Sequence, residues 1–177
     1  MSRAIFLDRD GVINEDDGYV YKPEGFRFKS GIFKFCKVAQ DKGYLLIVAT
    51  NQSGIARGYY TEQDYQVLTN WMLGEFDKQG VHITKAYHCP FHPDKGIGEY
   101  RCDSPDRKPN PGMLLKAKAE FDVDMANSIL IGDKSSDIEA GINAGVGRLI
   151  FLQDKYPNSN NSNAEIITHI SEAIKFL

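Results

Sequence analysis

Short apolar runs alternate along this chain with longer segments in which apolar residues recur at every third or fourth position. The short runs predict β-strands, because they are brief and are bounded by turn-forming residues. They cover Ala4–Leu7, Tyr44–Ala49, Ile83–His88, Ser128–Ile131 and Gly147–Leu152. The run at 44–49 is apolar throughout, as expected of a strand that is covered on both faces.

The periodic segments predict amphipathic helices with one apolar face. The first carries Ile32, Phe35, Cys36 and Ala39 and stops at Gly43, and the second follows an N-cap at Thr61 and carries Tyr65, Leu68, Met72 and Phe76. We expect a helix opening at Pro111, another that follows Asp133 and runs through about Ala144, and a terminal helix lined by Ile166, Ile167, Ile170 and Ile174. Cys89–Pro109 is expected to be a long ordered loop, and Asn158–Asn163 a polar loop.

This alternation predicts an α/β fold, a Rossmann-like three-layer sandwich with a mostly parallel sheet and helices on both faces. We expect one domain over residues 1–177, with an insertion at about 88–109. Ligands of such sheets bind at the carboxyl ends of the strands. Asp8, Thr50 and Asp133 each follow an apolar run, so all three are expected at that edge.

Composition excludes several classes of partner. The net charge of -3 provides no overall attraction to nucleic acid or to an anionic membrane surface. No stretch approaches the roughly 20 apolar residues of a membrane span. The three cysteines occur without a secretory signal, which favours a reducing, cytoplasmic setting over a disulfide framework.

Acidic residues supply the candidate chemistry. Asp8 and Asp10 lie just past a predicted strand, and Gly11 allows the chain to turn sharply there. Carboxylates held close together repel each other unless a cation or a proton lies between them. With Asp133 they offer oxygen ligands suited to Mg²⁺. Each Asp taken singly is explained as well by capping of a helix or turn, but acids at the ends of two strands favour a metal site.

The motifs resemble those of the haloacid dehalogenase-type phosphatases. FLDRDGVIN (Phe6–Asn14) is similar to the nucleophile motif of that family, with Val12 where Thr is common, and Thr50-Asn51, Lys108 and GDKSSD (Gly132–Asp137) follow in the family's order. DDGYV (Asp16–Val20), TNQSGIARG (Thr50–Gly58) and RKPNPGM (Arg107–Met113) are closer to one subgroup, which contains heptose bisphosphate phosphatases and histidinol-phosphate phosphatases. The absence of a long insertion after Asp10 then implies that no large cap domain covers the site.

This resemblance implies a role for each motif. Asp8 is expected to attack phosphorus, and Asp10 to protonate the leaving oxygen and then activate water. Mg²⁺ is expected between Asp8, the backbone carbonyl of Asp10, and Asp133. The Thr50 hydroxyl, the Asn51 amide and the Lys108 ammonium are expected to hold the phosphoryl oxygens. Asp137 is expected to orient Lys134 or to cap its helix.

The resemblance also implies the residues that contact the rest of the substrate. Arg107 is a candidate for a second phosphate or for sugar hydroxyls, although a surface arginine would look the same in sequence. The other expected contacts are Lys134, a flap formed by Asp16, Asp17, Gly18 and Tyr19, and the pair Gln52 and Ser53.

The cysteine-containing loop departs from the family pattern. Related phosphatases hold a structural zinc with a C-x-H pair followed by C-x-C, but here Phe91, Ser104 and Asp106 occupy three of those positions. Cys89, His92 and Cys102 remain candidate ligands for a shifted Zn²⁺ site. The alternative is a zinc-free loop held by its prolines and hydrogen bonds.

The expected function is magnesium-dependent hydrolysis of the 7-phosphate of a heptose 1,7-bisphosphate, for bacterial surface glycans. The nearest alternative is histidinol-phosphate hydrolysis. An alternative of another class is a non-catalytic phosphoester-binding protein, which would not need Asp8, Asp10, Lys108 and Asp133 together. The expected partner is a small phosphorylated sugar, bound by a monomer.

Overall fold

The computed structural model describes residues 1–158 and 163–177. Within them, a 6-stranded sheet consists of β1 (Ala4–Leu7), β2 (Leu45–Asn51), β3 (Lys85–Cys89), β4 (Ile129–Gly132), β5 (Arg148–Leu152) and β6 (Ala164–Ile167). The strand order is β3-β2-β1-β4-β5-β6, and all neighbouring strands are parallel. The order changes direction between β1 and β4, the position at which sheets of this kind form a ligand crevice.

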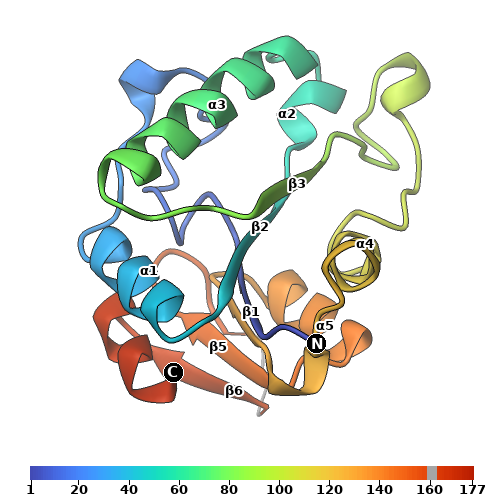
Figure 1. The fold of residues 1–177 in the computed structure, drawn as a ribbon. Coiled ribbons are helices and arrows are strands. Elements are labelled where there is room, and N and C mark those ends of the chain that lie inside the picture. Colours follow the sequence, from blue (N-terminus) through green and yellow to red (C-terminus); the bar gives the residue numbers. More distant parts are fainter. Residues whose placement is uncertain (159–162) are drawn as a thin grey trace.

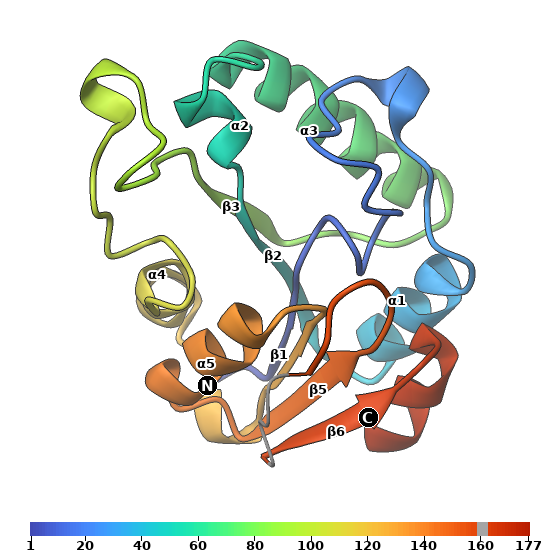
Figure 2. The ribbon, with the colours of Figure 1, turned by 180° about the vertical axis from the view of Figure 1, so that it is seen from behind.

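Helices cover both faces of the sheet (Figures 1 and 2). The main ones are α1 (Ile32–Asp41), α3 (Glu62–Lys78), α4 (Gly112–Phe121) and α5 (Ser135–Ala144), with a short α2 (Ser53–Ala56) after β2. Residues of α1 and α3 belong to one buried apolar cluster, and residues of α4 and α5 to a second. The predicted three-layer α/β sandwich is therefore confirmed.

Strand β1 lies between these two clusters. Its side chains alternate between them: Ile5 and Leu7 pack with α1 and α3, whereas Ala4 and Phe6 pack with α4 and α5. Because successive strand residues point to opposite faces, a central strand needs apolar residues at every position. The unbroken run AIFL thus places the following residue, Asp8, at the middle of the sheet's carboxyl edge.

The capping signals agree with the structure. The Thr61 side chain accepts a hydrogen bond from the Asp64 backbone amide, and the Asp64 carboxylate accepts one from the Thr61 amide. This reciprocal pair satisfies two amides that have no partner within the helix. None of the helices in the described residues is long and apolar enough to cross a membrane.

The prediction of a terminal helix from Ile166 to Ile174 is wrong. Residues 164–167 form the edge strand β6, and a 3-10 helix, η4 (Ile170–Phe176), follows it. Ile166 is 54% exposed and Ile167 only 1%, which is the alternation of a strand. Strand β5 has backbone groups to pair on this side, and they bind β6 in register from Leu149 to Leu152. The expected polar loop lies mostly outside the described residues, since 159–162 are not among them.

The long loop between β3 and α4 has little regular structure, as expected. It contains one short 3-10 helix, η2 (Gly98–Tyr100). The Ile97 amide donates to the carbonyl of Ala56 in α2 (2.9 Å), and the His92 amide donates to the Tyr100 carbonyl (3.1 Å). The loop is therefore fastened both to itself and to the segment that follows β2.

Candidate active site

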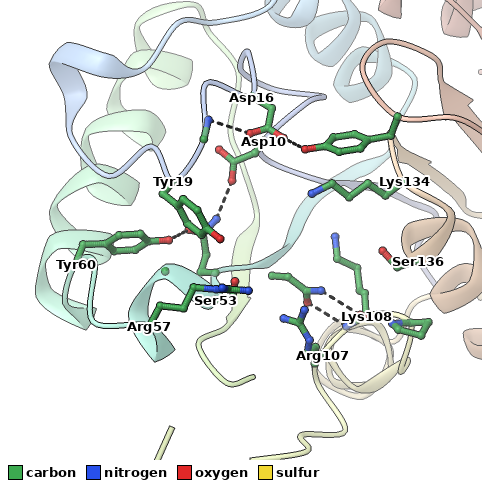
Figure 3. Close-up of a pocket in the computed structure, with 16 residues that line it drawn as sticks. Asp10, Asp16, Tyr19, Ser53, Arg57, Tyr60, Arg107, Lys108, Lys134 and Ser136 are labelled. Carbon is green, nitrogen blue, oxygen red and sulfur yellow. Dashed lines mark hydrogen bonds between the residues drawn. The ribbon is translucent and has the colours of Figure 1, made fainter. Parts of the chain in front are cut away.

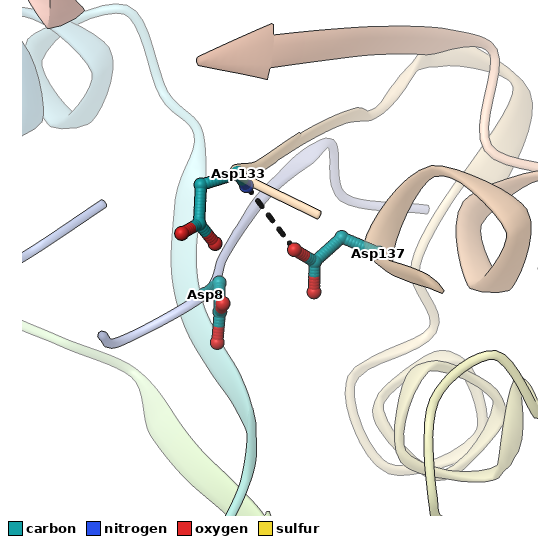
Figure 4. Close-up of side chains that lie close together, drawn as sticks. All are labelled: Asp8, Asp133 and Asp137. Atoms are coloured by element: carbon teal, nitrogen blue, oxygen red, sulfur yellow. Dashed lines mark hydrogen bonds between the residues drawn. The ribbon is translucent and has the colours of Figure 1, made fainter. Parts of the chain in front are cut away.

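Three acidic side chains converge at the carboxyl edge of the sheet (Figure 4). Asp8 follows β1, Asp133 follows β4, and Asp137 lies in the first turn of α5. Each offers an oxygen within 4.8 Å of the other two, and all three side chains are buried. The predicted meeting of Asp8 and Asp133 is confirmed, and it follows from the adjacency of β1 and β4.

Asp137 has other partners in this cluster. Its Oδ2 accepts hydrogen bonds from the backbone amides of Asp133 (3.1 Å) and Lys134 (3.0 Å), so it caps α5 as predicted. In contrast, Oδ1 of Asp133 is buried without a hydrogen-bond partner. An unsatisfied buried carboxylate oxygen is costly unless a cation reaches it. Asp8 and Asp133 therefore fit the needs of a hard divalent cation such as Mg²⁺.

Gly11 makes room for this cluster. Its backbone has φ +93°, and a Cβ at this position would lie 2.0 Å from Oδ2 of Asp133. Any larger residue would therefore collide with the carboxylate, and it would also be strained at this φ. The turn after Asp10 is thus shaped by the approach of Asp133.

The electrostatics of the cluster match its geometry. Burial, followed by repulsion from Asp137, raises the pKa of Asp8 to about 6. Burial, followed by repulsion from Asp8 and Asp137, raises the pKa of Asp133 to about 9. Both shifts disfavour the ionised carboxylates. A divalent cation at this position would reverse that preference, because it would stabilise both ionised groups.

Lys108 is the buried cation of the site. Its Nζ lies 3.1 Å from Oδ1 of Asp8 and 2.5 Å from Oδ1 of Asp137, and it donates to the Ala49 carbonyl at 2.7 Å. Burial opposes the charge, but Asp137 and Asp8 outweigh it and raise the pKa of Lys108. The ammonium is therefore charged and held beside Asp8.

Asn51 fixes the backbone that carries Lys108. The Asn51 side-chain amide donates to the Lys108 carbonyl (3.1 Å), and its oxygen accepts from the Lys108 amide (3.0 Å). This reciprocal pair joins the end of β2 to the loop before α4. The sequence motif suggested only a backbone contribution from Asn51, so this side-chain role is an addition from the structure.

The Asp10 carboxylate is not one of the three grouped carboxylates and has its own hydrogen-bond partners. It accepts hydrogen bonds from the Arg9 guanidinium (3.1 Å), from the Asn14 amide (3.0 Å) and from the Gln52 amide (3.0 Å). Arg9 is only 1% exposed, which is unusual for an arginine, and it forms a buried ion pair with Asp10. The side chain of Asp10 is therefore aimed into the pocket by its neighbours, separately from the Asp8 and Asp133 carboxylates.

A pocket of about 540 Å³ opens beside Asp10 (Figure 3). Most of the predicted substrate contacts line it: Asp16, Gly18, Tyr19, Asn51, Gln52, Ser53, Arg107, Lys108 and Lys134. Thr50 is buried just behind it, within 2.8 Å of the Gln52 amide. Sequence reasoning missed other lining residues, namely Gly54, Arg57, Tyr60, Pro109, Ser136 and Tyr156.

The predicted flap is only partly turned toward the pocket. Asp17 is exposed and pairs with Arg27 at 2.7 and 2.9 Å, and it does not line the pocket. Asp16 lines the pocket and accepts a hydrogen bond from the Tyr156 hydroxyl at 2.8 Å. Asp17 therefore anchors the flap through Arg27, and Asp16 joins it to the segment after β5.

Two arginines lie at one end of the pocket, away from Asp10 and Asp16 (Figure 3). Burial, followed by repulsion from the nearby Arg57 guanidinium, lowers the pKa of Arg107. Nε of Arg57 is buried without a hydrogen-bond partner. In the described part of the chain, carboxylates pair with Arg9, Arg27 and Arg148 but with neither of these two arginines. This end of the pocket is therefore suited to an anion.

The expected zinc ligands are not assembled in the described residues. Cys89 is buried and packs in the cluster under α4, whereas Cys102 is exposed. Nδ1 of His92 accepts hydrogen bonds from the backbone amides of Asp94 (3.1 Å) and Lys95 (3.0 Å). The sole group of three metal-binding side chains found there is the Asp cluster. The described residues do not bring the three candidate ligands together, so the shifted zinc site that the sequence left open gains no support from the fold.

Comparison with known proteins places the chain in a family. A D-glycero-alpha-D-manno-heptose-1,7-bisphosphate 7-phosphatase from Burkholderia mallei is 54% identical over 154 residues, covering 87% of this chain and 82% of that protein. This chain belongs to the haloacid dehalogenase-like phosphatases. The family described as HAD-hydrolase-like matches residues 106–174.

Other members of the family are similar over nearly the whole chain. A D-glycero-beta-D-manno-heptose-1,7-bisphosphate 7-phosphatase from Vibrio cholerae is 44% identical, covering 97% of this chain and 92% of that protein. The crystal structure of D,D-heptose 1,7-bisphosphate phosphatase from B. bronchiseptica, complexed with magnesium and phosphate, superimposes with a TM-score of 0.82 at 25% identity, covering 98% of this chain and 97% of that one. The resemblance inferred from the motifs is confirmed.

Proposed function

We propose that this protein hydrolyses the 7-phosphate of D-glycero-D-manno-heptose 1,7-bisphosphate through an aspartyl-phosphate at Asp8. The observation that carries the proposal is the arrangement of Asp8, Asp133 and Lys108 beside a pocket that also holds two arginines, and these pair with no carboxylate of the described residues. Asp8, Asp133 and Lys108 are suited to attack on one phosphate of the substrate, and the two arginines are suited to binding a second phosphate. The similarity to phosphatases named for this substrate supports the same assignment.

In the first step, an oxygen of Asp8 attacks phosphorus, and the bond from phosphorus to the sugar oxygen breaks. Asp10 gives a proton to that leaving oxygen. The Lys108 ammonium, beside Asp8, and the Thr50 hydroxyl hold the oxygens of the transferring group, so that charge is stabilised by fixed donors. Arg9 and Gln52 keep the Asp10 carboxyl directed into the pocket.

In the second step, water attacks the phosphorus of the aspartyl-phosphate. Asp10 accepts a proton from this water, the bond between phosphorus and Asp8 breaks, and inorganic phosphate leaves. The oxygens of Asp8 and Asp133, with the backbone carbonyl of Asp10, would hold Mg²⁺. When bound, the ion supplies positive charge that lets an anionic carboxylate approach an anionic phosphate.

The two arginines favour a bisphosphate over histidinol phosphate. A second phosphate of the sugar can accept hydrogen bonds from the guanidinium groups of Arg57 and Arg107. Histidinol phosphate instead carries an ammonium group, which two nearby cations would repel. The same charges argue for a bound anion rather than a neutral sugar at this end of the pocket.

The enzyme is further proposed to act in a reducing compartment, the cytoplasm. Cys36, Cys89 and Cys102 are all free, and Cys102 is exposed. An exposed free thiol persists more readily where thiols are kept reduced.

Phosphate release from both anomers of the heptose bisphosphate and from histidinol phosphate, with Mg²⁺ or with EDTA, tests the proposed function. We expect kcat/KM to be at least tenfold higher for one of the bisphosphates, and phosphorus NMR to show loss of the 7-phosphate. A tenfold preference for histidinol phosphate, about 1.4 kcal/mol of discrimination, would contradict the assignment.

Alanine variants of the two arginines test the second-phosphate subsite. Arg57→Ala and Arg107→Ala should each lower kcat/KM for the bisphosphate by about tenfold or more, because each removes charged hydrogen bonds to phosphate. Activity on p-nitrophenyl phosphate, which has no second phosphate, should change far less. Equal losses on the two substrates would remove these residues from substrate recognition.

A further inference from the structure

A line of hydrogen bonds leads from Tyr60 to two residues of the proposed reaction. The Tyr60 hydroxyl donates to Oε1 of Gln52. Nε2 of Gln52 in turn donates to Oδ2 of Asp10 at 3.0 Å and to Oγ1 of Thr50 at 2.8 Å. Figure 3 shows Tyr60 pointing along this line toward Asp10. Tyr60 is 6% exposed and Gln52 is 2% exposed, so solvent has little access to replace these bonds.

The Tyr60 hydroxyl and the Asp10 carboxylate together determine which way the Gln52 amide faces. A glutamine amide has one accepting end and one donating end. Since Tyr60 donates to the oxygen, the NH₂ group must face Asp10 and Thr50. The reverse orientation would place the amide oxygen against the Asp10 carboxylate, where two acceptors repel each other. Burial raises the pKa of Tyr60, so this hydroxyl keeps its proton throughout the physiological range.

The amide orientation then controls the Thr50 hydroxyl. Oγ1 of Thr50 accepts from Gln52 and directs its own proton at the Asn51 carbonyl over 3.4 Å, a long hydrogen bond that a phosphoryl oxygen can replace. A threonine expected to hold a phosphoryl oxygen must act as a donor. If the amide rotated, the amide oxygen could accept the Thr50 proton and take it away from the phosphate. The amide also supplies Asp10 with a hydrogen bond in addition to that from Arg9.

The surroundings of Tyr60 hold its ring in this place. The ring stacks on Tyr21, with centroids 5.4 Å apart and an interplanar angle of 1°. On another side, a Cβ at Gly54 would lie 2.1 Å from the Tyr60 ring, so only glycine leaves room for it. Contacts of the ring therefore hold Tyr60 in place, and the hydroxyl binds Gln52.

We propose that Tyr60 is a positioning residue for the phosphatase reaction, and that it acts through Gln52 on both Asp10 and Thr50. The inference rests on the proposed function. It assigns to Tyr60 an effect on turnover, with no direct part in bond breaking. Its loss should lower kcat, since the reacting groups become misoriented, and should leave KM nearly unchanged, since the two arginines and Lys134 still bind the substrate.

Tyr60→Phe tests this assignment because it removes the hydroxyl and keeps the stacked ring. We expect kcat on the heptose bisphosphate to fall about tenfold, with KM within about twofold of wild type. The thermal midpoint should stay within a few degrees of wild type. Tyr59→Phe is a matched control, because Tyr59 is 54% exposed and its ring packs edge-on against Tyr19. This control should retain wild-type kcat.

A double-mutant cycle shows whether the effect passes through Gln52. Gln52→Met keeps the shape of the side chain and removes its hydrogen bonds, so it should lower kcat by at least as much as Tyr60→Phe. In the Gln52→Met background, Tyr60→Phe should cause no further loss. A Tyr60→Phe kcat within about twofold of wild type, a change confined to KM, or a full additional loss in the Gln52→Met background would each overturn the proposal. An inactive wild-type protein would instead overturn the proposed function itself.

Discussion

Replacing Lys108 by methionine would remove the buried cation that lies beside Asp8 and Asp137. Its Nζ lies within 3.1 Å of Oδ1 of Asp8 and 2.5 Å of Oδ1 of Asp137, and it also binds the Ala49 carbonyl. Lys108, Asp8 and Asp137 are 5%, 9% and 2% exposed. Methionine has a similar length, so the substitution changes the charge and the hydrogen bonds more than the packing.

The expected loss follows from this burial. Removing one partner of a buried ion pair costs about 3–5 kcal/mol, because the other charge is left without compensation. Asp8 and Asp137 can take up protons and so reduce the uncompensated charge. The expected loss in the free energy of unfolding is therefore near the lower end of that range, about 3 kcal/mol in EDTA. For a chain of this length each kcal/mol lowers the thermal midpoint by about 2–4 °C. The midpoint should therefore fall by roughly 6–12 °C, and saturating Mg²⁺ should restore part of the loss by compensating Asp8.

Denaturant unfolding in EDTA and in Mg²⁺ would measure this loss. Lys37→Met is the control, because Lys37 also pairs with a carboxylate, Asp41, at 2.5 Å, but both side chains are exposed. That change should cost less than about 0.5 kcal/mol. If Lys108→Met unfolded within about 1 kcal/mol of wild type in EDTA, the buried network would contribute far less than its geometry indicates.

Two other predictions concern the proposed nucleophile and the proposed metal site. Asp8→Asn should abolish phosphate release, as measured by a malachite green assay, while phosphate binding by calorimetry persists; activity within about tenfold of wild type would mean another nucleophile. The folded-state pKa values of Asp8 (about 6) and Asp133 (about 9) lie above their ordinary value of 3.8, so the folded protein holds more protons than the unfolded chain between these values. The contribution of this cluster to stability is therefore complete below about pH 4 and is lost as pH rises toward about 9. Mg²⁺ should raise the thermal midpoint more at pH 9 than at pH 6, and an equal rise at both would argue against binding at Asp8 and Asp133.

Local sequence signals were sufficient for most of the architecture. The strand Ala4–Leu7 was predicted from its unbroken apolar run, because it is buried on both faces. The helix Glu62–Lys78 was predicted from apolar residues at every third or fourth position, because it is buried on one face. Acids directly after such strands were expected at one edge of a parallel sheet, and the adjacency of β1 and β4 then brought Asp8 beside Asp133.

The structures of the C-terminal segment and of the cysteine-containing loop depended on their tertiary neighbours. The segment around Ile166 and Ile167 fits a short helix or a short strand by its apolar residues alone. The unpaired edge of β5 decided between them, because buried backbone groups need hydrogen-bond partners. Likewise, the cysteine spacing allowed a zinc site, and only the fold showed Cys89 buried and Cys102 exposed.

The same division holds for the site. Asp8, Asp10, Lys108 and Asp133 occur in motifs whose residue types indicate their chemistry, so the sequence was enough to propose them as the reacting groups. The tertiary structure alone decided which side chains surround them: it brought Arg57 beside Arg107, turned Asp17 away toward Arg27, and set Tyr60 behind Gln52. These contacts join residues on separate loops, and their formation depends on the packing of the whole sheet, which leaves no periodic trace along the chain.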